Sequence, residues 1–259
     1  MEKLLEYHNL IIETLKEIQK YIFNLEIVEN DIETKSNRRD IVTIVDKKVE
    51  EIITNKIKNK YPYHYILGEE TYDFNYEIKE ENVWVIDPID ATANFVKQKE
   101  DYCILIAFFE NKIPKLGYIF NVEKNELTYS IYKKGVFHKD KKVEIPKDID
   151  LKSSLVSIDV RKMWGTKLLE QVKENAFDMR FIGCAGLDGL RVIKGEFGAF
   201  ICPNLGPWDF APLLLMAQEL GLHISNFEGK YPKFGKRSDF IISTNSIFKN
   251  LNELDIIKK

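Results

Sequence analysis

The chain has 259 residues, of which 44% are hydrophobic, and it carries a formal net charge of −3. This apolar fraction can build a sizeable core, and without an excess of basic residues we expect no direct nucleic-acid binding. The N-terminus contains no apolar signal core and no run reaches the length of a membrane span, so we expect no membrane association. Cys103, Cys184 and Cys202 are widely spaced and lack zinc-site spacing, which is typical of a reducing compartment and predicts a cytoplasmic protein.

Two helices are predicted in the N-terminal part of the chain. Leucine and isoleucine recur at helical spacing over residues 2–25, and a second helical pattern runs from Val45 to Ile57. Asp46 falls in the first turn of this second helix, where a negative charge is favourable for the helix dipole. The polar residues 28–40 between the helices, which include Lys35, predict a turn or hairpin.

A short strand with acidic residues at its end follows. Tyr65 to Leu67 is apolar and stops at Gly68, and Glu69 and Glu70 come directly after it. A doubled glutamate is usually exposed surface, but here it occupies a strand end. The polar residues 71–82 predict a loop.

The stretch from Trp84 to Phe95 contains the residues from which we predict a chemical function. Val83 to Ile86 predicts a buried strand that ends at Asp87-Pro88, because proline cannot donate to a strand ladder. Asp90 then stands where a helix or tight turn would begin, with Thr92 beside it. Taken alone, Asp90 is more typical of a helix cap than of a metal ligand. Two carboxylates, a hydroxyl and free N–H groups nevertheless suit Mg²⁺ and a phosphate together, which indicates phosphoryl chemistry.

The rest of the chain predicts a strand-rich middle followed by alternating strands and helices. An antiparallel meander is expected over residues 102–109, 115–120, 126–132 and 135–138. Further strands are expected over residues 154–159, 198–202, 222–225 and 240–244, and further helices over 166–175, 186–194, 208–220 and 247–257. This order predicts a mixed α/β fold. No linker rich in proline, glycine or serine divides the chain, so we expect one domain over residues 1–259 with two lobes, roughly 1–150 and 151–259.

Four segments occur in a fixed order along the chain, namely Asp40-Ile-Val-Thr-Ile-Val-Asp46, Gly68-Glu69-Glu70, Asp87-Pro-Ile-Asp-Ala-Thr-Ala-Asn-Phe95 and Trp208-Asp209-Phe-Ala-Pro212. They resemble the motifs of the inositol monophosphatase family of Mg²⁺-dependent, lithium-sensitive phosphatases, and the resemblance covers nearly the whole chain. It implies a layered α/β/α/β/α sandwich, the activity of a phosphoric monoester hydrolase on a small phosphate ester, and a homodimer.

The resemblance also implies a role for individual residues. It assigns Glu69, Asp87 and the carbonyl of Ile89 to one Mg²⁺, and Asp87, Asp90 and Asp209 to a second. Thr92 and Glu69 would orient the attacking water, and Asp46 would lie near a further metal or its water. For Asp46 and Asp209 a favourable charge at a helix start is the competing explanation. The implied contacts to phosphate or substrate are Asp90, Ala91, Thr92, Gly183, Cys184, Ala185, Cys202 and Asp209, with Lys35 and Glu70 as further polar residues of the site.

The implied cofactor is Mg²⁺, as two or three ions, with Mn²⁺ as a substitute and with Li⁺ and Ca²⁺ as inhibitors. Two metal ions can generate the nucleophile and stabilise the leaving oxygen, so no cysteine, serine or histidine nucleophile is required. The four histidines fall in no motif.

Two positions depart from the family pattern. Ala91 stands where the family has glycine, and we expect it to adopt helical backbone angles so that its methyl points away from phosphate. Cys202 replaces a glutamate that contacts inositol hydroxyls, which weakens the case for inositol as the substrate. The leading expectation is hydrolysis of inositol monophosphate or a sugar phosphate. Adenosine 3′,5′-bisphosphate, fructose 1,6-bisphosphate and NADP stay open as substrates, as does a non-catalytic regulatory role.

Overall fold

The computed structural model describes residues 2–25, 32–34, 41–73, 77–79 and 81–254. Its helices are α1 (Glu2–Phe23), α2 (Ile44–Lys60), α3 (Thr92–Lys97), α4 (Val160–Met163), α5 (Lys167–Asn175), α6 (Ala185–Ile193), α7 (Pro207–Leu220) and α8 (Asn245–Glu253). Its strands are β1 (Ile32–Thr34), β2 (Ile41–Thr43), β3 (Tyr65–Gly68), β4 (Asn82–Asp90), β5 (Cys103–Glu110), β6 (Ile113–Asn121), β7 (Glu126–Ile131), β8 (Gly135–His138), β9 (Lys141–Lys142), β10 (Leu155–Ile158), β11 (Asp178–Arg180), β12 (Ala199–Leu205), β13 (His223–Ser225) and β14 (Ser238–Ser243).

The larger sheet contains strands β3 to β9 in chain order. Strand β3 pairs with β4 in parallel, and every following pair is antiparallel, so the predicted meander is confirmed. The predicted hairpin near the N-terminus corresponds in part to the antiparallel pair β1 and β2. Lys35 lies outside the described residues.

Both faces of the larger sheet are covered by helices, and the sequence of β5 shows how. Cys103, Leu105, Ala107 and Phe109 belong to one core cluster, whereas Ile104, Ile106 and Phe108 belong to another. Successive side chains of a strand point to opposite faces, so β5 is apolar on both. The first cluster includes residues of α6 and α7, and the second includes residues of α1 and α2.

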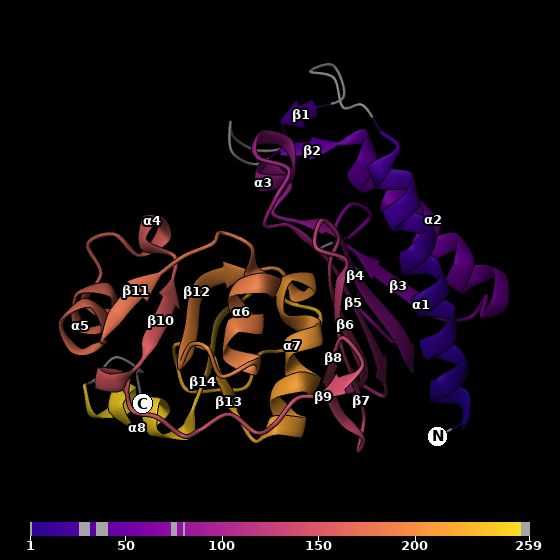
Figure 1. Cartoon of the computed structure of the whole chain (residues 1–259). Helices are drawn as coiled ribbons and strands as arrows, with labels where there is room; N and C mark the ends of the chain where they lie inside the picture. The colour runs from indigo at the N-terminus through magenta and orange to yellow at the C-terminus, as the bar shows by residue number, and fades with distance from the viewer. Residues whose placement is uncertain (1, 26–31, 35–40, 74–76, 80, 255–259) are drawn as a thin grey trace.

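A second sheet lies on the far side of α6 and α7, with the strand order β11-β10-β12-β14-β13. Phe200 of β12 and Phe240 of β14 join the core that α6 and α7 share with the larger sheet. On the outer face, Ile201 and Ile241 pack with residues of α5 and α8. Helices α6 and α7 therefore form the middle layer of an α/β/α/β/α sandwich, as predicted (Figure 1).

Helix α7 is the most enclosed of the described helices. Eleven of its fourteen residues are buried, because it packs between the two sheets. Its first residue is Pro207, whose missing N–H would be unpaired at that position in any case, and Gly221 ends it in the left-handed conformation with a φ of 67°. Because α7 packs between the two sheets, its first turn, which contains Asp209, faces the end of the larger sheet.

Several predicted boundaries need correction. Strand β4 continues to Asp90, whereas the sequence predicted an end at Asp87. The edge strand β11 and the one-turn helix α4 were not predicted, because three or four residues carry no readable period. Helix α8 ends at Glu253. Among the described helices, none combines the length and the apolarity that crossing a membrane requires.

Candidate active site

A β-bulge in β4 brings two carboxylates to one face of the sheet. Asp87 pairs with Leu105 and Asp90 with Cys103, so three steps along β4 match two steps along β5. Without the extra residue, positions 87 and 90 would point to opposite faces. Opposed residues of an antiparallel pair share a face, and Leu105 and Cys103 both face α6 and α7. The bulge also accommodates Pro88, which has no N–H to donate.

Asp87 is the most deeply buried of the predicted carboxylate ligands. Its residue is 1% exposed, and its Oδ1 has no hydrogen-bond partner among the described residues. Burial raises the pKa of Asp87 well above its ordinary value, and the negative charges of Glu69, Asp90 and Asp209 raise it further. A buried carboxylate oxygen without a donor, surrounded by other carboxylates, is unfavourable in a metal-free protein. A hard divalent cation would satisfy it, and carboxylate and carbonyl oxygens are the ligands that Mg²⁺ prefers.

Asp90 and Asp209 each accept a hydrogen bond from a backbone N–H at the start of a helix. Oδ2 of Asp90 accepts a 2.6 Å hydrogen bond from the N–H of Gly186 in the first turn of α6. Oδ2 of Asp209 accepts a 2.8 Å hydrogen bond from the N–H of Gly206, directly before α7. Burial raises the pKa of Asp90 to about 6, and burial together with Asp90 raises the pKa of Asp209 to about 7. The predicted cap at Asp90 therefore exists, but it serves α6 and not the helix that follows Asp90 in the chain.

The segment after β3 positions Glu69. The N–H of Glu69 donates to the carbonyl of Ile86, which extends the parallel pairing of β3 and β4. Glu50 holds the next two residues: its Oε2 accepts from the N–H of Glu70 at 2.8 Å, and its Oε1 accepts from Oγ1 of Thr71 at 2.6 Å.

Glu50 was not predicted as part of the site. It is 2% exposed, and a Cβ at position 68 would lie only 2.3 Å from its Cδ, so a larger residue there would displace the Glu50 carboxylate. Its spacing of four residues from Asp46 on α2, which places both on one helix face, was the available signal. We assign Glu50 a positioning role because it contacts the backbone around Glu69.

Asp46 and Thr92 form a hydrogen-bonded pair across 46 residues of chain. Oγ1 of Thr92 donates to Oδ1 of Asp46 at 2.7 Å and lies 3.1 Å from the carbonyl of Ile89. Oδ2 of Asp46 accepts from the N–H of Thr43 at 2.9 Å, which completes a capping box at the start of α2. Burial nevertheless raises the pKa of Asp46. Asp46 thus stabilises the helix start and also orients the Thr92 hydroxyl.

The prediction for the Ala91 backbone was wrong. Ala91 precedes α3 with a φ of 71° and a ψ of 52°, which is the left-handed conformation. In this conformation the Cβ of an L-residue lies too close to the neighbouring carbonyl oxygen, whereas glycine adopts it without strain. Ala91 is partly exposed, so its strain is not offset by deep packing of the methyl.

The predicted substrate segment around Gly183 is organised by a buried carboxylate that the sequence did not reveal. Asp188 is fully buried and accepts hydrogen bonds from the N–H groups of Ile182 and Gly183 and from Oγ of Ser157. Gly183 has a φ of 85°, which favours glycine, and Gly183 and Ala185 are partly exposed. These contacts hold the turn in one conformation.

The two cysteines that the family resemblance places among the substrate contacts are both buried. Cys184 is fully buried, and its Sγ lies 3.1 Å from Oδ2 of Asp90. Cys202 is 3% exposed, and burial raises the pKa of its thiol to about 12. Side-chain contacts from either thiol to a substrate would require rearrangement of the core.

Comparison with known proteins shows the family to which the chain belongs. Residues 2–256 match the inositol monophosphatase family. The chain is 31% identical over 227 residues to the inositol-1-monophosphatase of Bacillus subtilis, covering 86% of each chain. It is 29% identical over 201 residues to the fructose-1,6-bisphosphatase/inositol-1-monophosphatase of Thermotoga maritima, covering 78% of this chain and 77% of the other.

A solved structure of similar fold contains ligands. The chain superposes with a TM-score of 0.91 and 33% identity on an IMPase/NADP phosphatase complexed with Mg²⁺ and phosphate, covering 97% of this chain and 95% of the other. The layered fold and the converging carboxylates define a metal-dependent phosphoric monoester hydrolase. The chain belongs to the inositol monophosphatase family.

Proposed function

We propose that this protein hydrolyses a small phosphorylated alcohol with Mg²⁺ held by Glu69, Asp87, Asp90, Asp209 and the carbonyl of Ile89. The observation that carries the proposal is Oδ1 of Asp87, which is buried without a donor among the other carboxylates. Bound Mg²⁺ would lower the pKa of a coordinated water and neutralise charge on the phosphoryl group. Two ions would share Asp87, and a third would lie near Asp46.

Other residues around the metal ligands would orient the attacking water and the substrate. Thr92, whose hydroxyl donates its hydrogen to Asp46, would accept a hydrogen bond from the attacking water, and Glu69 would also orient that water. The N–H groups of Ala91 and Thr92 would bind phosphate oxygens. The turn that Asp188 holds would bring Gly183 and Ala185 to the alcohol part of the substrate.

For the substrate, we propose inositol monophosphate or a sugar phosphate, with fructose 1,6-bisphosphate and NADP as the alternatives that the names of relatives support. Adenosine 3′,5′-bisphosphate belongs in the same panel. We further propose that the protein is a cytoplasmic homodimer, which size-exclusion chromatography with light scattering and fractionation of cells would test.

The test is release of inorganic phosphate from this panel at fixed Mg²⁺, with and without EDTA. Activity should require Mg²⁺, Mn²⁺ should substitute in part, and Ca²⁺ and Li⁺ should inhibit. Full turnover in excess EDTA would refute the metal mechanism. Absence of turnover on every substrate, with Mg²⁺ binding intact, would favour a regulatory protein on the same fold.

Asp87→Asn tests the bridging ligand. The change keeps the size of the side chain but removes the charge that two cations would share, so kcat should fall by at least roughly 100-fold. Metal-free stability should be kept or raised, because buried like charges repel. Asp140→Asn is the matched control, since Asp140 is exposed on the turn between β8 and β9. Equal activity of the two variants would refute the assignment of Asp87.

A further inference from the structure

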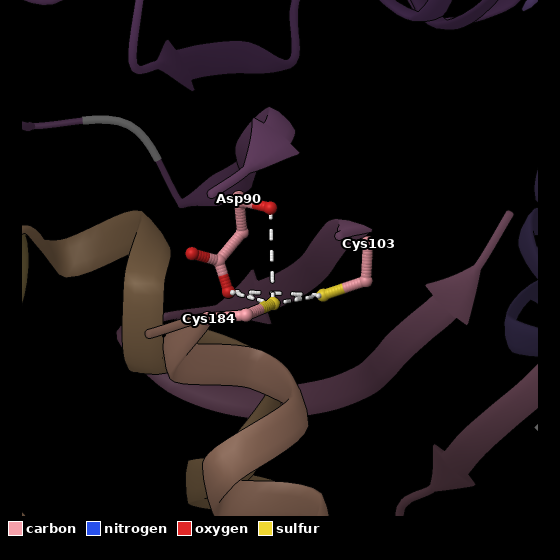
Figure 2. A group of neighbouring side chains, drawn as sticks. All are labelled: Asp90, Cys103 and Cys184. Atoms are coloured by element: carbon pink, nitrogen blue, oxygen red, sulfur yellow. Dashed lines mark hydrogen bonds between the residues drawn. The ribbon is translucent and has the colours of Figure 1, made fainter. Parts of the chain in front are cut away.

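Three potential metal-ligand atoms meet beside the proposed Mg²⁺ site in an arrangement that phosphatase chemistry does not use. They are Sγ of Cys103 on β5, Sγ of Cys184 before α6 and Oδ2 of Asp90 on β4 (Figure 2). The two sulfurs are 3.5 Å apart, and they lie 3.7 Å (Cys103) and 3.1 Å (Cys184) from the carboxylate oxygen. The three residues come from separate segments, and both thiols are free.

These distances are close to the distances between ligand atoms, the edges of the tetrahedron, in a tetrahedral zinc site. With Zn–S bonds of about 2.3 Å and Zn–O bonds of about 2.1 Å, two sulfur ligands are about 3.8 Å apart, and a sulfur and an oxygen ligand are about 3.6 Å apart. Each observed edge differs from these values by half an ångström or less. A cation could therefore be bound after small side-chain movements, with its fourth position left for water.

The surrounding structure holds the three atoms in place. Cys103 and Cys184 are fully buried, and the N–H of Gly186 fixes Oδ2 of Asp90 at 2.6 Å. A Cβ at position 186 would lie 2.8 Å from Sγ of Cys103 and 3.3 Å from Oδ2 of Asp90, so glycine is required for this approach. One carboxylate oxygen faces the sulfurs and the other is turned away from them (Figure 2). Gly183 and Ala185, which flank Cys184 in the chain, are partly exposed.

We propose that Cys103, Cys184 and Asp90 form a binding site for a thiophilic divalent cation such as Zn²⁺ or Cd²⁺. Two thiolates and one carboxylate select a soft cation, whereas Mg²⁺ requires oxygen ligands and would bind elsewhere. Binding breaks the two S–H bonds and releases two protons to solvent, and it forms one bond to the cation from each sulfur and one from Oδ2 of Asp90.

A consequence follows for catalysis and rests on the proposed function. Asp90 would be shared between the thiophilic cation and the Mg²⁺ site. A second cation on Oδ2 withdraws charge from the carboxylate and places a positive charge beside the Mg²⁺ position, so Mg²⁺ binding weakens. Occupancy of the cysteine site therefore inhibits hydrolysis and raises the Mg²⁺ concentration that activity requires.

Binding is tested without any substrate. The full chain, reduced with a phosphine and free of Mg²⁺, is titrated with Cd²⁺ while the sulfur-to-cadmium charge-transfer absorbance is recorded. We expect one Cd²⁺ per chain, and a loss of affinity of at least roughly tenfold in Cys103→Ala and in Cys184→Ser. Cys202→Ser is the matched control and should bind as the unmodified protein does. No absorbance in the unmodified protein, or equal binding by Cys103→Ala, would overturn the site.

A measurement on the unmodified protein covers the case in which the variants do not fold. Cd²⁺ should protect Cys103 and Cys184 from slow alkylation, as followed by mass spectrometry, and leave Cys202 unprotected. Equal protection of all three cysteines, or of none, would overturn the proposal.

Inhibition is measured separately. Zn²⁺ should inhibit phosphate release more strongly in the unmodified protein than in Cys103→Ala, each relative to its own rate without Zn²⁺. Binding with equal inhibition of both proteins would overturn the regulatory consequence, and a protein without phosphatase activity would still report the site through Cd²⁺.

Discussion

Replacement of Ala91 by glycine tests the link between the strained backbone and stability. Ala91 has a φ of 71°, a conformation that costs an L-residue roughly 1–2 kcal/mol. Glycine removes this strain but adds unfolded-state entropy worth roughly 0.5–1 kcal/mol. The methyl is partly exposed and packs in part against the core around α6 and α7, so its removal also costs some packing. Ala91→Gly should therefore raise the free energy of unfolding by up to roughly 1 kcal/mol, or the melting temperature by up to about 4 °C.

The chain offers a matched control two residues further on. Ala93 lies within α3, where glycine is less favourable than alanine by about 1 kcal/mol. The two substitutions remove the same atoms from neighbouring positions, but their effects on stability should have opposite signs. Urea denaturation of the metal-free protein measures both, because bound metal would otherwise add to the stability of the folded state.

A loss of stability in Ala91→Gly as large as that in Ala93→Gly would refute the reasoning, since it would mean that position 91 is not left-handed. The strain at Ala91 is present in both the free and the substrate-bound enzyme, so its removal does not change the energy difference between them. The kcat/KM of Ala91→Gly should therefore stay within about threefold of the original value. A larger gain would show that the methyl itself hinders phosphate.

Three further predictions concern other residues of the site. Thr92→Val removes the hydroxyl held by Asp46 and should lower kcat by about 100-fold while Thr92→Ser retains most activity, as measured by phosphate release at saturating Mg²⁺. Glu50→Gln should weaken Mg²⁺ binding by about tenfold with kcat nearly kept at saturation, because it loosens the segment that holds a ligand; unchanged Mg²⁺ activation would contradict the positioning role. The metal-free protein should lose stability as pH rises from about 4 to 7, because Asp90 and Asp209 have folded-state pKa values of about 6 and 7 against an ordinary value of 3.8 and so bind more protons when folded. Saturating Mg²⁺ should remove this loss, and thermal unfolding across that pH range measures it.

The local elements of the fold were readable from the chain. The apolar period of α1 and α2, the run of residues in β5 and the enclosed composition of α7 each depend on neighbouring residues alone. The order of the motifs was also enough to relate Glu69, Asp87 and Asp209 to one family site, because a motif is read from consecutive residues and needs no coordinates.

The arrangement of the site was decided by tertiary contacts. A bulge turned Asp87 and Asp90 to the same face, and no residue-level period predicts where an extra residue enters a ladder. The left-handed Ala91 results from joining that bulged strand to α3, which overrides the local preference of alanine.

Long-range packing explains the remaining differences. Cys103 and Cys184 are 81 residues apart, and each looks like an ordinary buried cysteine until β5 and α6 meet at Asp90. Glu50 gains its role only when α2 lies against the end of β3. The sequence by itself indicated most of the elements and the family, and it predicted the acidic ligand set that we propose. The tertiary structure decided which carboxylates share a face of the sheet, which groups hydrogen-bond to each of them and which other side chains they contact. The sequence could not show these contacts, because they join residues that are far apart in the chain and share no sequence pattern.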